Sequence, residues 1–562
     1  MSNSIPEIED ADCLLIFGYN AADSHPIVAR RVIRAKEKGA KLIVVDPRKT
    51  ESARIADLWL PIRNGANMAL VNTFAHVLVE ERHYNREYYN REYVEKYTEG
   101  FDEYRKTVAK YTPEETRNIT GLPPELVRQA MHMYATASSA FILYGMGVTH
   151  YGQAVDVVKG LSGLALLTGN FGRPNVGIGP VRGQNNVQGA CDMGALPNVF
   201  PGYQPVVNAE IRARFAKAWG LPDLPAKPGC TLTDVPHLVK EGKLKAYYIF
   251  GEDSLQTDPD SAGLREALRR LDLVIVQDIF MNKTTEFADV VLPATSWGEH
   301  EGVYSSADRG FQRFRKAVEP KGDVKIDWEI ISLMATAMGY PMKYRDTEEI
   351  WNEMRELCPN FYGATYEKLD EMGSVQWPCP TLDHPGTPYL YSGNKFSTAS
   401  GKGQLFACEW RPPMERPDDE YPLVLSTVRE VGHYSGRSMT GNCPSLQSLA
   451  DEPGYLQINS VDAAKYGIKD EALLWISSRR GKVLTRAQIT NRANQGAVYM
   501  TYQWWIGACN ELTLDNVDPI SKTPEYKYCA AKVEAIPDQV WAERYLQEEY
   551  SKIRQRFSEA VG

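Results

Sequence analysis

The chain has 562 residues, 43% of them hydrophobic and 24% charged, which is typical of a soluble globular protein and enough for roughly three or four domains. Its formal charge of -9 and its lack of any run of Lys and Arg argue against a nucleic-acid partner. No apolar run approaches the roughly 20 residues that cross a bilayer, and the first residues lack a secretory signal pattern, so we expect a cytoplasmic protein without a membrane span.

A strand–helix–strand pattern opens the chain. The sequence predicts an apolar strand at 13–18, a turn at 19–24 and a helix at about 26–38. A second apolar strand follows at 41–46, and a further apolar run ends in proline at 56–61. This order is typical of a parallel sheet covered by helices.

The same order of elements recurs in the middle of the chain. A strand is expected at 247–251, a turn at 252–258, a helix at about 262–270 and a second strand at 273–278. The run at 288–293 again ends in proline. The chain therefore contains an internal repeat.

The spacing of landmark residues supports the repeat. From Gly18 to Asp46 there are 28 residues, and from Gly251 to Asp278 there are 27. Backbone amides at such a turn favour phosphates, and an acidic residue ending the second strand can bond a ribose or the N–H edge of guanine. No full G-x-G-x-x-G motif is present, which disfavours an ordinary NAD site. We predict duplicated nucleotide-binding halves; the alternative is plain α/β scaffolding in which Asp23 and Ser24 only cap a helix.

The segment 168–194 between the two halves is rich in glycine and amide side chains. It carries Gln184, Asn185, Asn186 and Gln188, and one guanidinium, Arg182. Amides donate and accept hydrogen bonds, and Arg suits a carboxylate or phosphate. We expect a long ligand-facing loop here; the alternative is a solvated surface loop.

The remaining α/β pattern lies between and beside the halves. Amphipathic helices are expected at 66–80 and 124–136, and a buried strand at 140–145 leads into a ligand-facing turn that ends at His150. The Pro- and charge-rich stretch 207–237 is expected to be a surface excursion.

The amino-acid composition changes in the C-terminal part. A stretch at 375–400 that is rich in Pro, Gly, Ser and Thr predicts a domain boundary. Beyond it, short β-like runs at 423–426, 473–478, 482–489 and 496–501 suggest a β-barrel-like domain. His433 is more simply a structural histidine than a ligand, and the last 25 residues are expected to form a charged amphipathic helix.

Nine cysteines are scattered along the chain without any Cys-x-x-Cys pair. The sequence therefore offers no zinc or iron–sulfur ligand spacing, and we assign no metal ligand. Buried free thiols in a reducing compartment are the default interpretation.

Several long motifs together resemble one family. The run Pro180-Val-Arg-Gly-Gln-Asn-Asn-Val-Gln-Gly-Ala-Cys-Asp-Met-Gly-Ala-Leu-Pro197 resembles the hallmark of the formate dehydrogenase catalytic subunits among the molybdopterin oxidoreductases. The segments 251–253, 295–302, 426–435 and 523–529 are similar in the same order. The likeness is greatest to the selenocysteine-type formate dehydrogenases of formate hydrogenlyase systems, and it covers essentially the whole chain.

The resemblance implies a fold, a cofactor and a reaction. The fold would be α/β, with two pseudo-repeated dinucleotide-binding domains that have parallel sheets, plus a C-terminal β-barrel-like domain. Two molybdopterin guanine dinucleotides would surround one Mo or W. The reaction would be the two-electron oxidation of formate to CO2 or its reverse, with electrons passing through a [4Fe–4S] cluster to electron-transfer subunits or a hydrogenase.

The resemblance also implies a division of the chain into domains. The first pterin-dinucleotide domain would be 1–184. The second would combine 185–296 with 326–347. A remnant of the cluster-side domain would combine 297–325 with 348–389, and the barrel-like domain would be 390–562.

Site residues are carried over position by position. Arg182 matches the substrate arginine, which would orient the formate carboxylate as its hydrogen leaves. The first dinucleotide would contact Phe17, Gly18, Asn20, Asp23, Ser24, Asp46, Arg48, Met146, His150 and Gln184; at His150 the family more often has glutamine. The second would contact Asp253, Thr257, Gln277, Asp278 and Asp327. From the terminal domain Arg429, Ser435, Tyr502, Tyr526 and Lys527 would close over the pterins.

One departure from the family matters. Its members carry a Cys-rich cluster domain and then a metal-ligating Cys or selenocysteine with a His beside it, and this sequence contains neither. We hypothesise a gene model truncated at a UGA selenocysteine codon, and we expect negligible formate oxidation from this polypeptide alone. An in-frame UGA upstream, preceded by Cys-rich codons, would support the hypothesis. The competing functions are a related reductase, for example of nitrate, and a non-catalytic pterin-binding protein.

Overall fold

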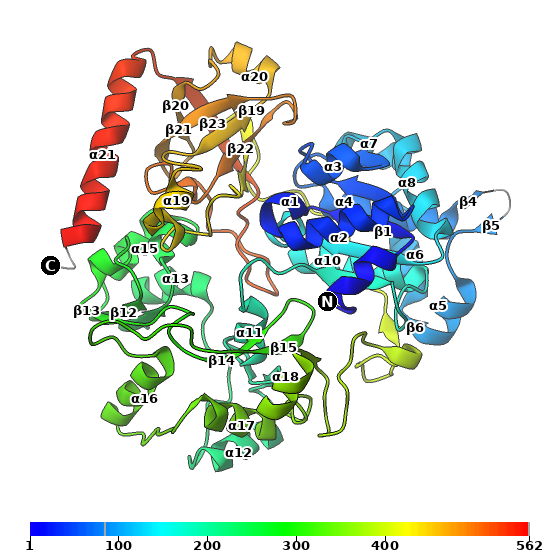
Figure 1. The fold of residues 1–562 in the computed structure, drawn as a ribbon. Coiled ribbons are helices and arrows are strands. Elements are labelled where there is room, and N and C mark those ends of the chain that lie inside the picture. The colour runs from blue at the N-terminus through cyan, green and yellow to red at the C-terminus, as the bar shows by residue number, and fades with distance from the viewer. Residues whose placement is uncertain (84–85, 560–562) are drawn as a thin grey trace.

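The structure is a computed structural model that describes residues 1–83 and 86–559. Two units with parallel sheets, a small antiparallel sheet and a closed β-barrel follow one another along the chain (Figure 1). The expected fold class, α/β with duplicated parallel units and a C-terminal barrel, is confirmed.

The first unit is built on a five-stranded parallel sheet in the order β3–β2–β1–β7–β8. All five residues of β1 (Cys13–Phe17) are buried, as are those of β7 (Ala140–Tyr144), because both strands are covered on two faces. Cys13, Leu15 and Phe17 pack with α4 (Asn67–Glu80) and α10 (Ala154–Leu167). The other strands of the sheet are β2 (Lys41–Val45), β3 (Leu58–Leu60) and β8 (Gly177–Pro180). Helix α2 (Pro26–Glu37) packs against Leu14 and Ile16, and the unit also contains α8 (Pro124–Thr136).

The second unit repeats this plan on a smaller scale. Its sheet has the parallel order β11–β12–β13, made of Ala246–Phe250, Leu273–Asp278 and Val290–Pro293. Helix α15 (Ser261–Leu268) contributes Leu264 and Leu268 to the core beneath β12. Every strand and helix predicted for the second copy is present, within one or two residues at its ends.

Two stretches differ from their sequence-based expectation. The segment 168–194 is not one continuous loop, because Gly177–Pro180 forms β8 and Val187–Asp192 forms the short helix α11. Similarly, 207–237 is not only a surface excursion, since it contains α12 (Ala209–Ala218), which buries Phe215. In both places pairing or packing against distant parts of the chain overrides a weak local signal.

An antiparallel sheet of β14 (Gly302–Ser305), β15 (Gly310–Phe314) and β16 (Val375–Gln376) follows the second unit. Its core is aromatic, with Phe311 in edge-to-face contact with Trp351 and Phe361. Helices α17 (Thr347–Leu357) and α18 (Tyr366–Met372) pack against it, whereas α16 (Asp327–Ala337) lies nearer the second parallel sheet (Figure 1).

The C-terminal part is a closed six-stranded barrel in the order β18–β22–β19–β21–β20–β23. Its strands are Leu423–Val428, Ala497–Thr501, Tyr455–Ile458, Lys482–Ile489, Leu473–Ser477 and Cys529–Ala535. The final helix α21 (Gln539–Glu559) buries Leu546 against the barrel and runs down toward the second unit, where Arg556 pairs with Glu286 (Figure 1).

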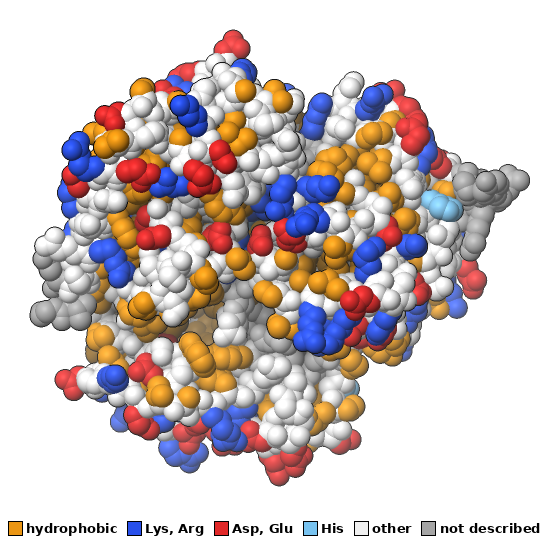
Figure 2. Space-filling model, turned by 45° about the horizontal axis from the view of Figure 1, so that its top comes forward, with side chains coloured by type: hydrophobic (Ala, Val, Ile, Leu, Met, Phe, Trp, Pro, Cys, Tyr) orange, Lys and Arg blue, Asp and Glu red, His pale blue; other side chains and the backbone are white. Residues whose placement is uncertain are grey.

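Within the described residues, none of the helices combines the length and apolarity that crossing a bilayer requires. The visible face carries Lys, Arg, Asp and Glu side chains in mixture, and both basic and acidic side chains lie near the centre of the view (Figure 2). At the junction of the first unit with the barrel, Arg492 pairs with Glu51 at 2.7 Å and donates to the carbonyl of Lys49.

Candidate functional site

The carboxyl ends of β1, β2 and β7 meet at one edge of the first sheet. Strand β1 has β2 on one side and β7 on the other, so the chain reverses its direction of strand addition at β1. Ligands of open α/β sheets bind in the crevice that opens at such a point. Gly18, Asp46 and Gly145 directly follow the three strands there.

Two glycines allow the turn after β1 and the turn after β7 to approach each other closely at this edge. Gly18 has φ +55°, and its carbonyl accepts a hydrogen bond from the Gly147 N–H at 2.9 Å. A Cβ on Gly18 would stand 2.6 Å from the carbonyl carbon of Gly147, which no side chain tolerates. The turn after β1 is therefore fixed against the turn after β7, and both face the same crevice.

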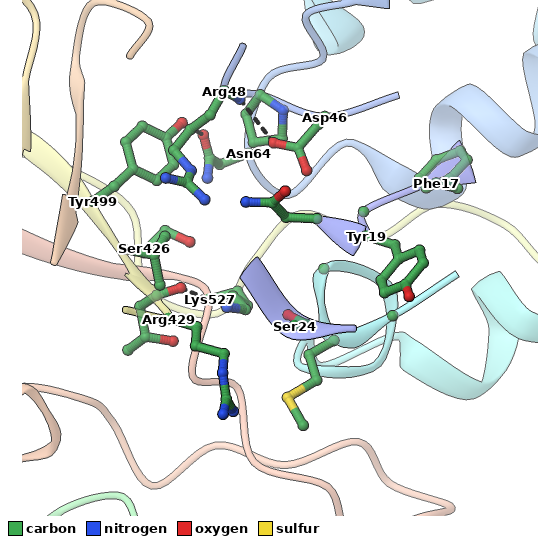
Figure 3. Close-up of a pocket in the computed structure, with 18 of the residues that line it drawn as sticks. Phe17, Tyr19, Ser24, Asp46, Arg48, Asn64, Ser426, Arg429, Tyr499 and Lys527 are labelled. Atoms are coloured by element: carbon green, nitrogen blue, oxygen red, sulfur yellow. Dashed lines mark hydrogen bonds between the residues drawn. The ribbon is translucent and has the colours of Figure 1, made fainter. Parts of the chain in front are cut away.

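The crevice is a cavity between the first unit and the barrel (Figure 3). Phe17, Tyr19 and Ser24 lie on one side, and Ser426, Arg429 and Lys527 face them from the barrel. An adjoining cavity shares Met146, Gly183, Thr427, Arg429, Tyr502 and Lys527 with it and extends to α14 (Ser254–Thr257) of the second unit. The predicted residues that line the two cavities are Phe17, Gly18, Asn20, Asp23, Ser24, Asp46, Arg48, Met146, His150, Gln184, Thr257, Arg429, Ser435, Tyr502, Tyr526 and Lys527.

Three cations stand on the walls of these cavities. The Arg48 guanidinium donates to the Gln457 side chain of the barrel at 3.0 Å, and it lies over the Tyr499 ring. Lys527 donates from Nζ to the carbonyl of Thr427, and burial together with the Arg48 charge lowers its pKa to about 8. Together with Arg429 they give the cavity a positively charged wall, which suits an anion such as a phosphate.

Two carboxylates line the same cavity close to Arg48. Asp46 is 9% exposed and accepts the Arg48 backbone N–H at 2.9 Å, and burial raises its pKa above the ordinary range. Asp23 also has a raised pKa because of burial, and it accepts from the Asn20 amide. Acceptors of this kind suit the N–H edge of a base or the hydroxyls of a ribose.

His150 lies where the first unit meets the end of the barrel. Its ring is 4.9 Å from the Tyr526 ring, and its carbonyl accepts from the Lys527 backbone N–H at 3.3 Å. Burial and the nearby Lys527 charge lower the pKa of His150 to about 3. The imidazole is therefore neutral at neutral pH and offers one donor and one acceptor.

The predicted residues of the second half gather at the corresponding edge of the second sheet. Gln277 donates to Asp327 at 2.7 Å, and Asp278 accepts from Asn282 at 2.9 Å. Burial raises the pKa of Asp278 to about 6. Asp253, 3% exposed, accepts from both the N–H and the hydroxyl of Thr284. Of the second-half residues only Thr257 lines the cavities shared with the first half.

Arg182 sits beside the cavity, immediately before Gly183 and Gln184. Its Nη1 donates to Sγ of Cys191 at 3.0 Å. Among residues 1–83 and 86–559, no carboxylate forms an ion pair with it. The charge of Arg182 is therefore available to a ligand.

Two amides of the same segment are structural. Asn186 accepts the Ser305 N–H at 3.0 Å, and Gln188 donates to the buried Asp192 at 2.7 Å. Asn186 thereby joins the segment to β14 of the antiparallel sheet, whereas the Gln188 bond to Asp192 stays within the segment. Gln184, the one amide of 168–194 assigned to the cofactor, lines the adjoining cavity, and its Oε1 is buried without a partner in the described structure.

Polar residues that line the cavity but were not predicted from the sequence include Tyr19, His25, Asn64 and Tyr499. Tyr19 and His25 lie in or beside the predicted turn, whose position could have identified them, whereas nothing in the sequence connects Asn64 and Tyr499 with it. Several buried polar atoms around the cavity have no partner within the described part of the chain, namely Tyr19 Oη, Asn20 Oδ1, His25 Nδ1, Asn64 Nδ2 and Arg429 Nε. Such atoms are costly unless a ligand satisfies them, so the walls fit a large polar group.

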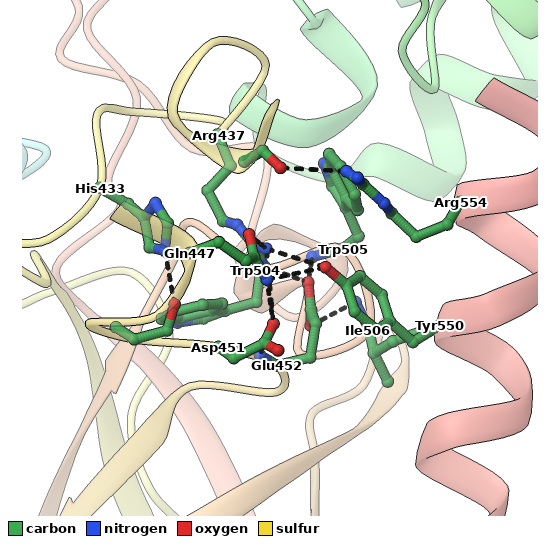
Figure 4. Close-up of polar contacts among 12 residues, drawn as sticks. His433, Arg437, Gln447, Asp451, Glu452, Trp504, Trp505, Ile506, Tyr550 and Arg554 are labelled. Carbon is green, nitrogen blue, oxygen red and sulfur yellow. Dashed lines mark hydrogen bonds and ion pairs between the residues drawn. The ribbon is translucent and has the colours of Figure 1, made fainter. Parts of the chain in front are cut away.

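The loop that brings Arg429 and Ser435 to the cavity is anchored behind it (Figure 4). Arg437 is fully buried between the rings of Trp504 and Trp505 and pairs with Glu452. His433 is 1% exposed and both ring nitrogens have partners, Thr440 and Ala450. The interpretation of His433 as a structural histidine is confirmed.

Metal-ligating side chains do not cluster in the part of the chain that the structure describes. Across those residues, no group of three or more His, Cys, Asp and Glu side chains is arranged to hold a metal ion.

Comparisons with known proteins agree on one family. The molybdopterin oxidoreductase family matches residues 1–337, and the family described as "Molydopterin dinucleotide binding domain" matches 423–530. The chain is 59% identical to formate dehydrogenase H of Escherichia coli K12, over all of this chain and 78% of that protein. It is 44% identical to the F420-dependent formate dehydrogenase 1 subunit alpha of Methanococcus maripaludis, over 95% of this chain and 78% of the relative. Acetylene hydratase from Pelobacter acetylenicus has the same fold, with a TM-score of 0.71 at 20% identity over 95% of this chain and 81% of the other.

Proposed function

The chain belongs to the molybdopterin oxidoreductase family, and we propose that it is the catalytic portion of a formate dehydrogenase, which interconverts formate and CO2 by a two-electron reaction. The cofactor of this reaction is molybdopterin guanine dinucleotide with Mo or W, in keeping with the two family matches. When bound, this group accepts the two electrons of formate. The residues of this chain bind the group and orient the substrate.

Two separate groups of residues would hold the two dinucleotides. We assign the first to the crevice at β1 and β2, where Asp46 would accept from the base and Arg48 with Lys527 would meet the phosphates. We assign the second to the edge of β11 and β12, where Asp253, Gln277 and Asp278 lie. The unpartnered Asp253 Oδ2 supports this assignment, because a buried carboxylate oxygen needs a donor.

Arg182 is the residue that we assign to the substrate. Formate is a carboxylate, and a guanidinium binds a carboxylate through two parallel hydrogen bonds that fix its orientation. The observation that carries the proposal is that Arg182 lies next to the cavity residues Gly183 and Gln184 with no ion-pair partner in the described chain. A substrate held in this way is oriented as its C–H hydrogen leaves.

The domain division remains part of the proposal. The first unit and its crevice support a dinucleotide domain at 1–184, and β11–β13 support a second at 185–296 with 326–347. The antiparallel sheet would be the cluster-side remnant at 297–325 with 348–389, and the barrel would lie within 390–562. Electrons would pass to electron-transfer subunits or a hydrogenase, in the cytoplasm.

The test is a comparison of substrates and of Arg182 variants in the holoenzyme from its native host. We expect formate-dependent reduction of a viologen dye and no nitrate-dependent oxidation of the reduced dye. Arg182→Gln should raise KM for formate by about a hundredfold or more, since it removes a charged hydrogen-bond pair, and Arg182→Lys should lose less. Nitrate turnover, or formate turnover that Arg182→Gln leaves intact, would contradict the proposal.

A further inference from the structure

We propose that Cys191 and His25 are positioning residues that hold Arg182 at its two ends through uncharged contacts, so that its full positive charge is kept for the substrate carboxylate. This inference rests on the proposed function, because it concerns the affinity of the same arginine for formate. It adds two residues to which neither the family resemblance nor the comparisons assign a role.

The first contact holds the guanidinium. Nη1 of Arg182 donates to Sγ of Cys191 at 3.0 Å, and Cys191 lies on α11, whose ends are tied to the antiparallel sheet through Asn186 and Asp192. A thiol is a weak and neutral acceptor. It can fix the direction of the guanidinium plane without competing for its charge.

The second contact holds the backbone of the same residue. Nε2 of His25 bonds to the carbonyl oxygen of Arg182. A carbonyl only accepts, so Nε2 must carry the hydrogen, and in the neutral ring Nδ1 is then an acceptor. That Nδ1 is buried and has no partner in the described structure, and the His25 side chain lines the cavity. Burial lowers the pKa of His25, which keeps the ring neutral.

Asp192, the carboxylate next to Cys191, makes its hydrogen bonds with groups other than Arg182. Asp192 is fully buried and follows Cys191 directly in the chain. Its Oδ1 accepts from Gln188 at 2.7 Å and from the Tyr203 hydroxyl at 3.0 Å. Its Oδ2 accepts from the Trp377 indole at 3.0 Å. Neutral donors thus occupy both oxygens, and the one acidic residue of α11 does not neutralise Arg182.

The physical consequence is a guanidinium that is oriented but not paired. A protein carboxylate at the Cys191 position would occupy the same N–H groups that formate needs and would cancel the charge that attracts it. Substrate would then have to displace an internal partner. An uncharged sulfur avoids this competition.

The test uses two isosteric replacements that differ in charge. In the holoenzyme, Cys191→Asp should raise KM for formate by about tenfold or more, because a carboxylate within reach of the guanidinium competes with the substrate. Cys191→Asn, of the same shape but neutral, should raise KM by no more than about threefold, and kcat should change less than KM in both. Formate-induced thermal stabilisation should be lost in Cys191→Asp and kept in Cys191→Asn. Cys230→Asp, at an exposed cysteine, controls for added charge.

The outcomes separate this inference from the proposed function. If the unmodified holoenzyme neither turns over formate nor is stabilised by it, the proposed function is wrong. If it does both, and Cys191→Asp and Cys191→Asn raise KM equally, the positioning inference is wrong. Should Cys191→Asp not fold, two His25 variants provide the test. His25→Phe loses the donor to the Arg182 carbonyl, whereas His25→Gln places an amide N–H near the position of Nε2. His25→Phe must raise KM more than His25→Gln, and equal effects would overturn the inference.

Discussion

Arg437 and Glu452 form an ion pair that is closed off from water, with the Arg437 side chain 0% exposed and that of Glu452 2% exposed. Glu452 also accepts the backbone N–H groups of Trp505 and Ile506 at 2.8 and 3.0 Å, and Arg437 donates to Gln447 at 2.8 Å (Figure 4). The pair thereby ties the loop between β18 and β19 to the strand-end segment after β22. That loop carries Arg429 and Ser435 to the cavity.

Breaking one side of this pair should destabilise the protein strongly. We expect Arg437→Met to lower the free energy of unfolding by about 3–5 kcal/mol, because it leaves the Glu452 charge buried without its partner. Arg437→Met with Glu452→Gln should cost less than the single change, since no unpaired charge remains. Urea unfolding of the four proteins in the double-mutant cycle measures this. Additive costs would show that the two side chains do not depend on each other.

Two equivalent glycines should differ sharply in their tolerance of alanine. Gly18 and Gly251 both have positive φ, +55° and +65°, and both end the first strand of their unit. A Cβ on Gly251 meets nothing within 4 Å, whereas one on Gly18 meets the Gly147 backbone at 2.6 Å. Gly251→Ala should therefore cost about 1–2 kcal/mol of backbone strain, and Gly18→Ala substantially more. Thermal unfolding of both variants is the measurement, and equal losses would mean that the Gly18–Gly147 crossing is not rigid.

Asp278 should make the stability of the protein depend on pH in a definite direction. Burial raises the folded-state pKa to about 6, against about 3.9 for an unfolded aspartate, so the folded state binds the extra proton between these values. Its contribution to stability is then full below about pH 4 and falls by roughly 2–3 kcal/mol as pH rises through 6. Asp278→Asn should flatten the loss of melting temperature between pH 4 and 7. An unchanged slope would contradict the raised pKa.

Lys527 should matter for retention of the cofactor more than for folding. Lys527 is half-buried at the cavity wall, and among the contacts of the described structure its ammonium bonds only to the Thr427 carbonyl, so a phosphate would gain a strong partner there. Lys527→Met should reduce the pterin content of the purified holoenzyme several-fold, measured by fluorescence after oxidation, with little change in the melting temperature of the cofactor-free protein. Full pterin content in this variant would exclude Lys527 as a phosphate ligand.

The repeated halves could be predicted from the sequence because their strands are short, mostly apolar and bounded by glycine and aspartate. The strand Gly177–Pro180 could not, since Gly-Ile-Gly-Pro has one large apolar residue and becomes a strand only by pairing with β7. Likewise Gln188 has the chemistry of a ligand, yet Asp192 and Tyr203 take its hydrogen bonds. Local chemistry identifies which groups can bind, and tertiary contacts decide which remain free to do so.

The site residues also differ in whether the local sequence or only tertiary contacts identify them. Asp46 and Asp278 could be predicted from strand ends, whereas Asn20 and Asp23, in the predicted turn at 19–24, were assigned through the family resemblance. The polar loops 427–435 and 523–528 could be recognised from the sequence, but Arg429, Ser435 and Lys527 were assigned individually through the family resemblance, because the barrel brings them to the cavity from far along the chain. The Cys191 contact with Arg182 depends on the helical turn of α11, which the glycine-rich sequence did not indicate.

The central claim is that two duplicated halves each hold one dinucleotide. The most direct measurement is the amount of guanosine monophosphate released by acid hydrolysis from the purified, formate-active holoenzyme, per polypeptide. We expect a ratio of about two, with a loss of one equivalent when Asp278→Ala removes the acceptor of the second half. A ratio of one in the active protein would contradict the claim.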